Sequence, residues 1–460
     1  MATPSWLADI DWDGVADEAQ TYLCDLLRID TSNPPGNELA ACRYIADLLA
    51  AEGIEHEVFE VAPGRANLVA RVPGKGTADP VLLATHLDVV PANAAEWTHP
   101  PFSGTVADGY IWGRGAVDMK NMAAMELAFL VTLSRHHRGQ AASDVIFAAV
   151  ADEEAGCELG SLWLAENHPE KVRARYAFGE VGGFTVHVGE SRICPVEVAE
   201  KGVCWLEVRA RGQAGHGSLP GQDNAVARIG EAAARLAAQP LPLKVTPVVR
   251  HFVNAVAAQQ PFPRGVILKQ ILSPLWSDLV LQRVLPDREQ ARLFEVLLHD
   301  TAAPTVLRAG DRVNVIPGEA VLQIDGRTLP GQTDDDLIRE IRAVIGEDLE
   351  IAVTRSMPPL EGDVNDPVVR IIQEVLDELD PGTVAVPNLV PGFTDAKAWS
   401  SLGCRCIGFS PMRLGPDDSF AALFHGVDER LPVDGFRFGV RALGEVVARV
   451  VEGEVASGAG

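Results

Sequence analysis

The chain has no run of about eighteen or more consecutive apolar residues, the length that a membrane-spanning helix needs. Its first residues contain neither a basic segment nor a long apolar core, so we expect no secretory signal peptide. The seven cysteines are odd in number and fall at no paired spacing, which argues against a disulfide framework. These absences predict a cytoplasmic protein with reduced thiols and no membrane partner.

Basic residues are also scarce, with 39 Lys and Arg against 64 Asp and Glu and a formal net charge of −25. A nucleic-acid-binding surface needs positive charge to neutralise phosphates, so we expect no nucleic-acid partner. The acidity mainly favours solubility, although carboxylates are also ligands for divalent cations. A length of 460 residues is too great for one ordinary core, which predicts two domains.

What the chain does contain is an alternation of helical periodicity with near-continuous apolar runs. Strands that are covered by helices on both faces have such runs, so the pattern predicts an α/β domain with a mixed, mostly parallel sheet between helices. The expected strands lie at 56–61, 67–72, 80–85, 144–151, 174–178 and 404–409, and the expected helices at 17–29, 37–52, 120–137, 366–379 and 433–451.

Near residue 198 the pattern changes to an alternation of apolar and polar residues, typical of antiparallel strands with one wet face. Expected strands at 198–211, 311–317, 320–327 and 349–355, with helices at 223–238 and 333–345, indicate an inserted α+β domain. Residues 240–310 show no clear pattern apart from helical pieces near 287–298. We therefore expect a catalytic domain of residues 1–197 and 359–460, interrupted by a second domain of residues 198–358.

Histidines and carboxylates follow three of the apolar runs directly. Because the carboxyl ends of parallel strands meet at one edge of a sheet, we expect these side chains to lie together. Asp118, on a glycine-rich turn, and His425, late in the chain, would complete the group. The strand-end residues are His86, Asp88, Glu153, Glu154 and Glu180.

Imidazole and carboxylate ligands suit zinc, or else cobalt or manganese, and the set is large enough for two ions. Asp118 is a reasonable bridge between them, and Asp88 could orient His86 by accepting its second N–H. Of the adjacent pair Glu153 and Glu154, one can bind metal while the other stays free as a general base. Each feature alone is more often structural; their joint occurrence at three strand ends favours a metal site.

These motifs resemble the co-catalytic metallopeptidase family that includes acetylornithine deacetylase, succinyl-diaminopimelate desuccinylase, carboxypeptidase G, aminoacylase and several dipeptidases. The resemblance covers nearly the whole chain in the right order. It implies a two-zinc catalytic domain and a smaller lid domain that also dimerises, hence a homodimer. The motifs that carry it are THLDVVP at 85–91, WGRGAVDMK at 112–120, DEEAG at 152–156, GHGS at 215–218, and His425.

The resemblance also implies the role of each residue in the site. His86 and Glu180 would bind one zinc ion, Glu154 and His425 the other, and Asp118 would bridge them, with a peptide bond after it that is often cis. Glu153 would be the general base and Asp88 would orient His86. His216, in the lid, would reach the site of a partner subunit and polarise the scissile carbonyl.

Four further residues match family positions that contact the substrate. Asn314 and Arg327 lie on expected lid strands, and an Arg fork pairs well with a carboxylate. Gly392 and Thr394 resemble the loop near the substrate. The motif after His425 and the residue Asn121 depart from the usual pattern, which leaves the substrate open rather than the metal site.

We therefore expect hydrolysis of an amide bond in a dipeptide or short peptide with a free C-terminal carboxylate. The same chemistry on an N-acyl amino acid, as in a deacetylase or desuccinylase, is the alternative. A non-catalytic binding protein on this fold is an alternative of another class, and the intact metal and base positions count against it.

Overall fold

A computed structural model describes residues 4–219, 221, 223–284 and 288–453. The chain forms two compact units. Unit 1 comprises Met1–Val198, Gly362–Pro387 and Thr394–Gly460, and unit 2 comprises Ala199–Glu361 and Asn388–Phe393. These divisions fall close to the ones expected from the sequence, with one difference: the segment that carries Gly392 groups with unit 2 rather than with the catalytic domain.

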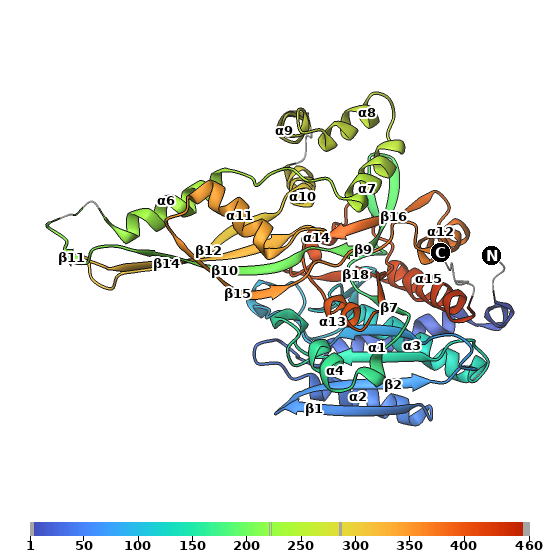
Figure 1. Ribbon diagram of the computed structural model, residues 1–460. Helices are drawn as coiled ribbons and strands as arrows, with labels where there is room; N and C mark the ends of the chain where they lie inside the picture. The colour runs from blue at the N-terminus through green and yellow to red at the C-terminus, as the bar shows by residue number, and fades with distance from the viewer. Residues whose placement is uncertain (1–3, 220, 222, 285–287, 454–460) are drawn as a thin grey trace. The chain divides into compact units, whose positions relative to one another are not determined.

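Unit 1 is built on a nine-stranded sheet (Figure 1). Its strands are β1 Glu55–Ala62, β2 Arg65–Val72, β3 Val81–His86, β6 Val145–Val150, β7 Tyr176–Gly179, β8 Val186–Val188, β9 Ser191–Glu200, β16 Thr383–Val390 and β17 Arg405–Gly408. They lie in the order β1-β2-β6-β3-β7-β17-β9-β16, with β8 paired to β9. A small second sheet contains β4 Thr105–Ala107, β5 Tyr110–Trp112 and β18 Arg430–Pro432.

The sheet is mixed, as predicted, and its central pairs are parallel. β3 pairs in parallel with β6 and β7, and β7 with β17. The flanking pairs β1–β2, β2–β6 and β9–β17 are antiparallel. Short turns join β1 to β2 and β8 to β9, and a short turn can only produce an antiparallel pair.

Helices cover both faces of the central strands. On one face, α3 packs against β3 and against α1 and α15; on the other, α4, α5 and α13 contribute Leu164, Val172 and Trp399 to a core with Leu82 and Ile146. Among the described helices, none has the length and apolar composition needed to cross a bilayer. The helical segments are η1 Ser5–Asp9, α1 Trp12–Leu27, α2 Glu38–Ala51, η2 Ala94–Glu96, α3 Lys120–His137, η3 Glu153–Ala155, α4 Ser161–Asn167, α5 Pro169–Val172, α12 Pro367–Leu379, α13 Ala396–Ser401, α14 Phe420–Leu423 and α15 Val433–Val451.

Unit 2 has a four-stranded antiparallel sheet in the order β12-β14-β10-β15, and helices α6 and α11 pack against it. Buried residues alternate along β10 and β14, which explains the apolar–polar alternation of the sequence. The strands are β10 Gly202–Arg211, β11 Gly215–His216, β12 Thr301–Ala309, β13 Val315–Ile316, β14 Glu319–Thr328 and β15 Glu350–Met357; the helical segments are α6 Ala225–Ala238, α7 Pro247–Ala258, α8 Arg264–Leu268, η4 Lys269–Leu272, α9 Ser277–Leu279, η5 Val280–Val284, α10 Arg288–Leu298 and α11 Asp334–Ile345.

The stretch 240–310, which sequence patterns left unassigned, forms the helical segments from α7 to α10 and then strand β12. β12 escapes a pattern search because Pro304 lies within it and the pairing with β14 shifts next to that proline. A proline cannot donate to a ladder and is tolerated at a sheet edge, which is where β12 lies.

Candidate metal centre and catalytic site

Three neighbouring strands of unit 1 end at the same edge of the sheet. β3 ends at His86, β6 is followed by Glu153 and Glu154 in the turn η3, and β7 is followed by Glu180. The parallel register of β3 with β6 and β7 brings these ends together. The edge is therefore the one at which ligands bind in α/β folds.

Asp118 lies between the two histidines of the site. Its Oδ1 is 3.0 Å from Nε2 of His86, and its Oδ2 is 2.9 Å from Nε2 of His425. The peptide bond between Asp118 and Met119 is cis, as the resemblance implied. Each carboxylate oxygen thus serves a different imidazole, which is the arrangement that a bridging ligand requires.

The remaining carboxylates divide between these histidines. Glu180 Oε2 is 3.6 Å from His86 Nε2, and Glu154 Oε2 is 3.2 Å from His425 Nε2. Two groups of candidate ligands result, one of His86, Asp118 and Glu180 and one of Asp118, Glu154 and His425, with ligand atoms within 4.8 Å of one another in each. They are the five residues expected from the sequence.

The electrostatics of this cluster call for positive charge. Burial disfavours the ionised form of Asp118, but both imidazoles outweigh it and hold its pKa below the ordinary value. Burial and then the charge of Asp118 raise the pKa of Glu180 to about 8. Burial lowers the pKa of His425, but its contacts with Asp118 and Glu154 prevail and raise it to about 10. A divalent ion bound here would relieve the repulsion among these carboxylates and favour their ionised forms.

The donor set also fits a metal ion. Two imidazoles and three carboxylates form a nitrogen and oxygen set that suits zinc, cobalt or manganese. Glu154 Oε1 is buried and has no hydrogen-bond partner among the described residues. A buried carboxylate oxygen without a partner is costly, and coordination of a cation would satisfy it.

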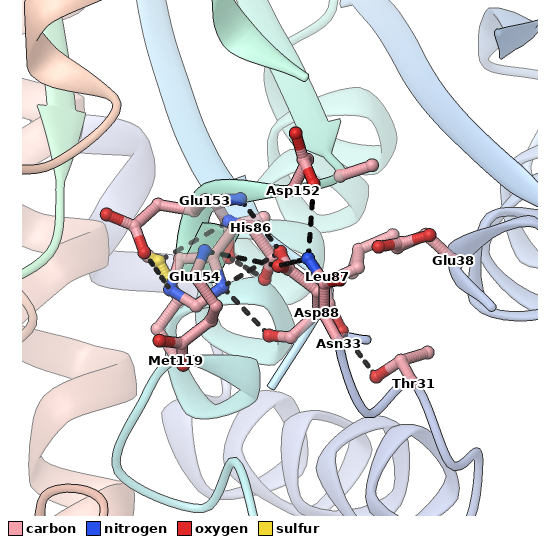
Figure 2. A network of polar contacts seen from close by, with 12 residues as sticks. Thr31, Asn33, Glu38, His86, Leu87, Asp88, Met119, Asp152, Glu153 and Glu154 are labelled. Atoms are coloured by element: carbon pink, nitrogen blue, oxygen red, sulfur yellow. Dashed lines mark hydrogen bonds and ion pairs between the residues drawn. The ribbon is translucent and has the colours of Figure 1, made fainter. Parts of the chain in front are cut away.

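His86 is held in the orientation that a ligand needs (Figure 2). Its Nδ1 lies 2.9 Å from the backbone carbonyl oxygen of Asp88 and 3.6 Å from Oδ1 of that residue. A carbonyl oxygen only accepts, so Nδ1 carries the proton and Nε2 is left for a metal. The nearer acceptor is thus the backbone of Asp88, whereas the sequence led us to expect its carboxylate.

The Asp88 carboxylate instead fixes the turn that carries the two glutamates (Figure 2). Its Oδ1 accepts from the backbone N–H of Glu153 at 3.1 Å, and its Oδ2 accepts from that of Glu154 at 3.2 Å and from Asn33 Nδ2 at 2.9 Å. Asn33 also donates to Asp152 at 3.2 Å. Because these groups are buried, Asp88 links the end of β3 to the end of β6 at a fixed spacing.

A second buried carboxylate fixes the loop of Asp118. Glu429 Oε1 accepts from the backbone N–H groups of Gly115, Val117 and Asp118 at 3.1, 2.7 and 3.1 Å, and its Oε2 accepts from Arg114 at 2.5 Å. Arg114 in turn donates to the carbonyl oxygen of His425 at 3.3 Å. One buried ion pair thereby holds the bridging ligand and the second histidine together.

Glu153 belongs to neither ligand group. Its Oε2 is 3.9 Å from His86 Nε2, so it lies beside the centre without completing it. Burial and then Glu180 raise the pKa of its carboxyl well above the ordinary value. A cavity is lined by Glu180, Thr394 and Asp395 among others, so the expected substrate residue Thr394 shares it with a candidate metal ligand.

The other expected substrate residues belong to unit 2. His216 and Asn314 are exposed at the two-stranded sheet of β11 and β13, where His216 contacts Ser218 through Nδ1. Arg327, on β14, pairs with Asp325 at 2.7 Å and lies over the ring of Phe393, the neighbour of Gly392. Arg327 and the Gly392 loop are thus brought together within unit 2.

Sequence reasoning missed three positioning residues. Asn33 lies between the helices expected at 17–29 and 37–52, Arg114 lies in the motif WGRGAVDMK, and Glu429 lies shortly after His425, but no role was assigned to any of them. Glu429 is fully buried and lies four residues after the candidate ligand His425. The backbone N–H groups that donate to this carboxylate cannot be recognised from the sequence.

Paired imidazole–carboxylate groups that share one aspartate at the edge of an α/β sheet define a metal-dependent hydrolase. The model of the family described as Peptidase family M20/M25/M40 matches residues 82–449, and the chain belongs to this family. It is therefore a metallopeptidase or amidohydrolase, and the resemblance inferred from the motifs is confirmed.

Among curated proteins, the chain is 28% identical over 389 residues to mouse N-fatty-acyl-amino acid synthase/hydrolase PM20D1, covering 80% of this chain and 73% of that one. Among solved structures, it is similar to an M20 family metallo-carboxypeptidase from Sulfolobus solfataricus, with a TM-score of 0.68, 17% identity and coverage of 94% and 99%. It is also similar to the Bacillus subtilis YXEP protein, a dinuclear metal binding peptidase, with a TM-score of 0.60, 16% identity and coverage of 96% and 99%.

Proposed function

We propose that the protein hydrolyses an amide bond in a dipeptide or short peptide with a free C-terminal carboxylate, with two zinc ions in its centre. The observation that carries this proposal is the sharing of Asp118 between two ligand groups, with Glu153 beside them and outside both. The dinuclear metal centre of the YXEP protein and the carboxypeptidase activity named for the Sulfolobus protein support it.

The residues of the centre have two kinds of role, metal binding and proton transfer. His86 and Glu180 would hold one ion, Glu154 and His425 would hold the other, and Asp118 would contribute to both. Such ions make a water more acidic and polarise a carbonyl oxygen. Glu153 removes a proton from the attacking water and later donates it to the leaving amine, so that the carboxyl ends the cycle as it began. Its buried position keeps bulk water from competing for that proton.

We assign substrate recognition to the residues that match substrate-contacting positions of the family. Arg327 Nη1 is buried and has no partner among the described residues, so this nitrogen can donate to the C-terminal carboxylate while Nε and Nη2 stay with Asp325. Asn314, Gly392 and Thr394 would line the same substrate. His216 would stabilise the oxyanion in a homodimer that forms through unit 2.

An N-acyl amino acid is the second candidate substrate, and the activity named for the mouse relative favours it. Both candidates share one chemical feature: the leaving amine belongs to an amino acid with a free α-carboxylate. The two differ in the acyl side, where a peptide presents an amino group and a fatty acid an apolar chain.

The test compares wild-type protein with Glu153→Gln and with the control Glu166→Gln, which changes an exposed glutamate on α4. Each is loaded with zinc or cobalt, its metal content is measured by mass spectrometry, and hydrolysis is followed on dipeptides and on N-acyl amino acids of short and long chain. We expect Glu153→Gln to keep its metal and to lose about 10²- to 10⁴-fold in rate, because a general base contributes that much.

Two results would contradict the proposal. If the metal-loaded wild type hydrolyses none of the dipeptides and none of the N-acyl amino acids, the result favours a non-catalytic binding protein. If Glu153→Gln loses its metal together with its activity, Glu153 is a ligand rather than the base. Rates for amidated dipeptides against free ones show whether the carboxylate is recognised.

A further inference from the structure

Five large apolar side chains are exposed on one short stretch of unit 2, the helical segments α8, η4 and α9 with the residues around them. We call residues 247–283 the helical insertion. Phe262 is 87% exposed and Leu275 86% exposed, where such side chains are normally buried. α8 contacts α7 and η4, and η4 contacts α9, so the exposed residues share one compact piece of structure (Figure 1). The full set is Phe262, Val266, Leu275, Trp276 and Leu279.

The charge of the helical insertion is opposite to that of the whole chain. It contains four basic residues and one acidic residue, Asp278, and therefore carries a formal charge of +3, whereas the whole chain carries −25. All four basic side chains are exposed, and none forms an ion pair with another residue of the described ranges. They are Arg250, Arg264, Lys269 and Arg283.

We propose that the helical insertion binds the surface of an anionic lipid bilayer. Phe262, Leu275 and Trp276 enter the boundary between headgroups and acyl chains, where aromatic and aliphatic side chains are stable. The basic side chains meet the lipid phosphates, with their aliphatic stems along the apolar layer. Since the Debye length is about 8 Å at physiological salt, the headgroups respond to this local positive charge more than to distant acidic surface.

This proposal revises the expectation of no membrane partner. That expectation rested on the lack of a spanning segment, and the described helices contain none. Binding at an interface needs no spanning helix, because a short apolar surface with flanking cations is sufficient for reversible attachment.

Other occupants fit the combined features less well. A second copy joined through the same surface by a two-fold axis would place cations against cations. An acidic peptide or a nucleic acid would pair with the basic residues but would leave Phe262 and Leu275 in water. An anionic bilayer satisfies both the apolar and the basic side chains at once.

The test is co-sedimentation of the full-length protein with extruded vesicles of phosphatidylcholine alone or with about three parts in ten of phosphatidylglycerol, at low, physiological and high salt. We expect binding to the anionic vesicles that weakens as salt rises, and at least about tenfold weaker binding to the neutral ones. The double variant Leu275→Ser with Trp276→Ser should lose most of the binding.

Charge variants separate the two contributions. Lys269→Gln and Arg264→Gln should each lower the partition coefficient about fivefold and reduce its salt dependence, since one basic residue near an anionic surface contributes about that much. Val106→Ser, at an exposed valine on β4 of unit 1, is the matched control and should bind as wild type does. Melting temperature and amide hydrolysis establish that every variant is folded.

Three results would overturn the proposal. The first is equal sedimentation with neutral and anionic vesicles, and the second is unchanged binding by the Leu275→Ser, Trp276→Ser variant. In the third, analytical ultracentrifugation without lipid shows that the wild type self-associates, that this double variant does not, and that neither binds vesicles. That pattern would make the surface an interface between copies of the chain.

Discussion

The candidate site residues in unit 1 and those in unit 2 are held in very different ways. Two buried carboxylates hold parts of the candidate metal centre, although the His425 side chain itself is 40% exposed: Asp88 fixes the turn of Glu153 and Glu154, and Glu429 fixes the loop of Asp118. In unit 2, by contrast, His216 is exposed on a strand of two residues.

The difference follows from what each set has to do. A metal centre works only when its ligands are placed before the ion arrives, because several like charges would otherwise move apart. A substrate-binding group such as His216 can stay exposed until the substrate binds, whereas Arg327 is already held by Asp325. Substitutions in the networks of unit 1 should therefore affect metal affinity, and those in unit 2 should affect KM with the metal still bound.

Loss of the bridging carboxylate should have the largest effect. Asp118→Ala removes one oxygen from each ligand group, and we expect the protein to retain at most one metal ion and no measurable hydrolysis. Asp79→Ala, at an exposed aspartate of the same unit, should retain full metal content and activity. Metal analysis after gel filtration checks both. An Asp118→Ala protein that keeps two ions would show that the two groups do not share this residue.

A change to Glu429, which holds the loop of Asp118, should have a smaller effect than the loss of Asp118 itself. In Glu429→Gln, the amide nitrogen must face either Arg114 or the N–H groups of the Asp118 loop, so donors oppose donors. We expect metal affinity, measured by chelator competition, to fall about 10- to 100-fold. Asp417→Asn, an exposed change in the same part of the chain, is the control. Unchanged affinity in Glu429→Gln would mean that the loop is fixed without this carboxylate.

The prediction for unit 2 is smaller and of another kind. Arg327→Lys keeps the charge but loses the planar fork, so KM should rise about tenfold or more while kcat and metal content change little. The wild type assayed on a C-terminally amidated dipeptide should show a similar loss. The variant should then discriminate less between the free and the amidated substrate. A fall in kcat at constant KM would assign Arg327 to the transition state instead of to the carboxylate.

The comparison also explains what the sequence could predict. His86, Asp118 and His425 could be found because each follows a strand or lies in a motif, and strand ends meet at one edge of a sheet. Asn33 and Glu429 could not, because their partners are distant in the chain: Asn33 donates to the carboxylates of Asp88 and Asp152, and Glu429 accepts from backbone N–H groups of the Asp118 loop. Because of Pro304, the strand β12 was not predicted from the sequence. No sequence pattern predicts that Asp88 contacts His86 through its carbonyl oxygen.

The smallest expected effect concerns a buried carboxyl group that belongs to neither of these networks. Glu126, on α3, is fully buried, and burial raises the pKa of its carboxyl well above the ordinary value, with only a partial offset from the backbone of Ala84. The folded state therefore keeps a proton that the unfolded chain releases above about pH 4.3. Above that pH the folded state binds more protons than the unfolded chain, so this residue makes stability fall as pH rises.

Glu126→Gln removes this pH dependence at nearly constant volume. We expect the variant to gain stability over the wild type between pH 5 and 8, by at most about 1.4 kcal/mol for each pH unit, because one proton is involved. Thermal melting of the metal-loaded proteins across this range measures the difference, with Glu166→Gln as the exposed control. A melting temperature that falls equally at every pH would show that Glu126 is ionised and paired in the folded state, like the carboxylates of the metal centre.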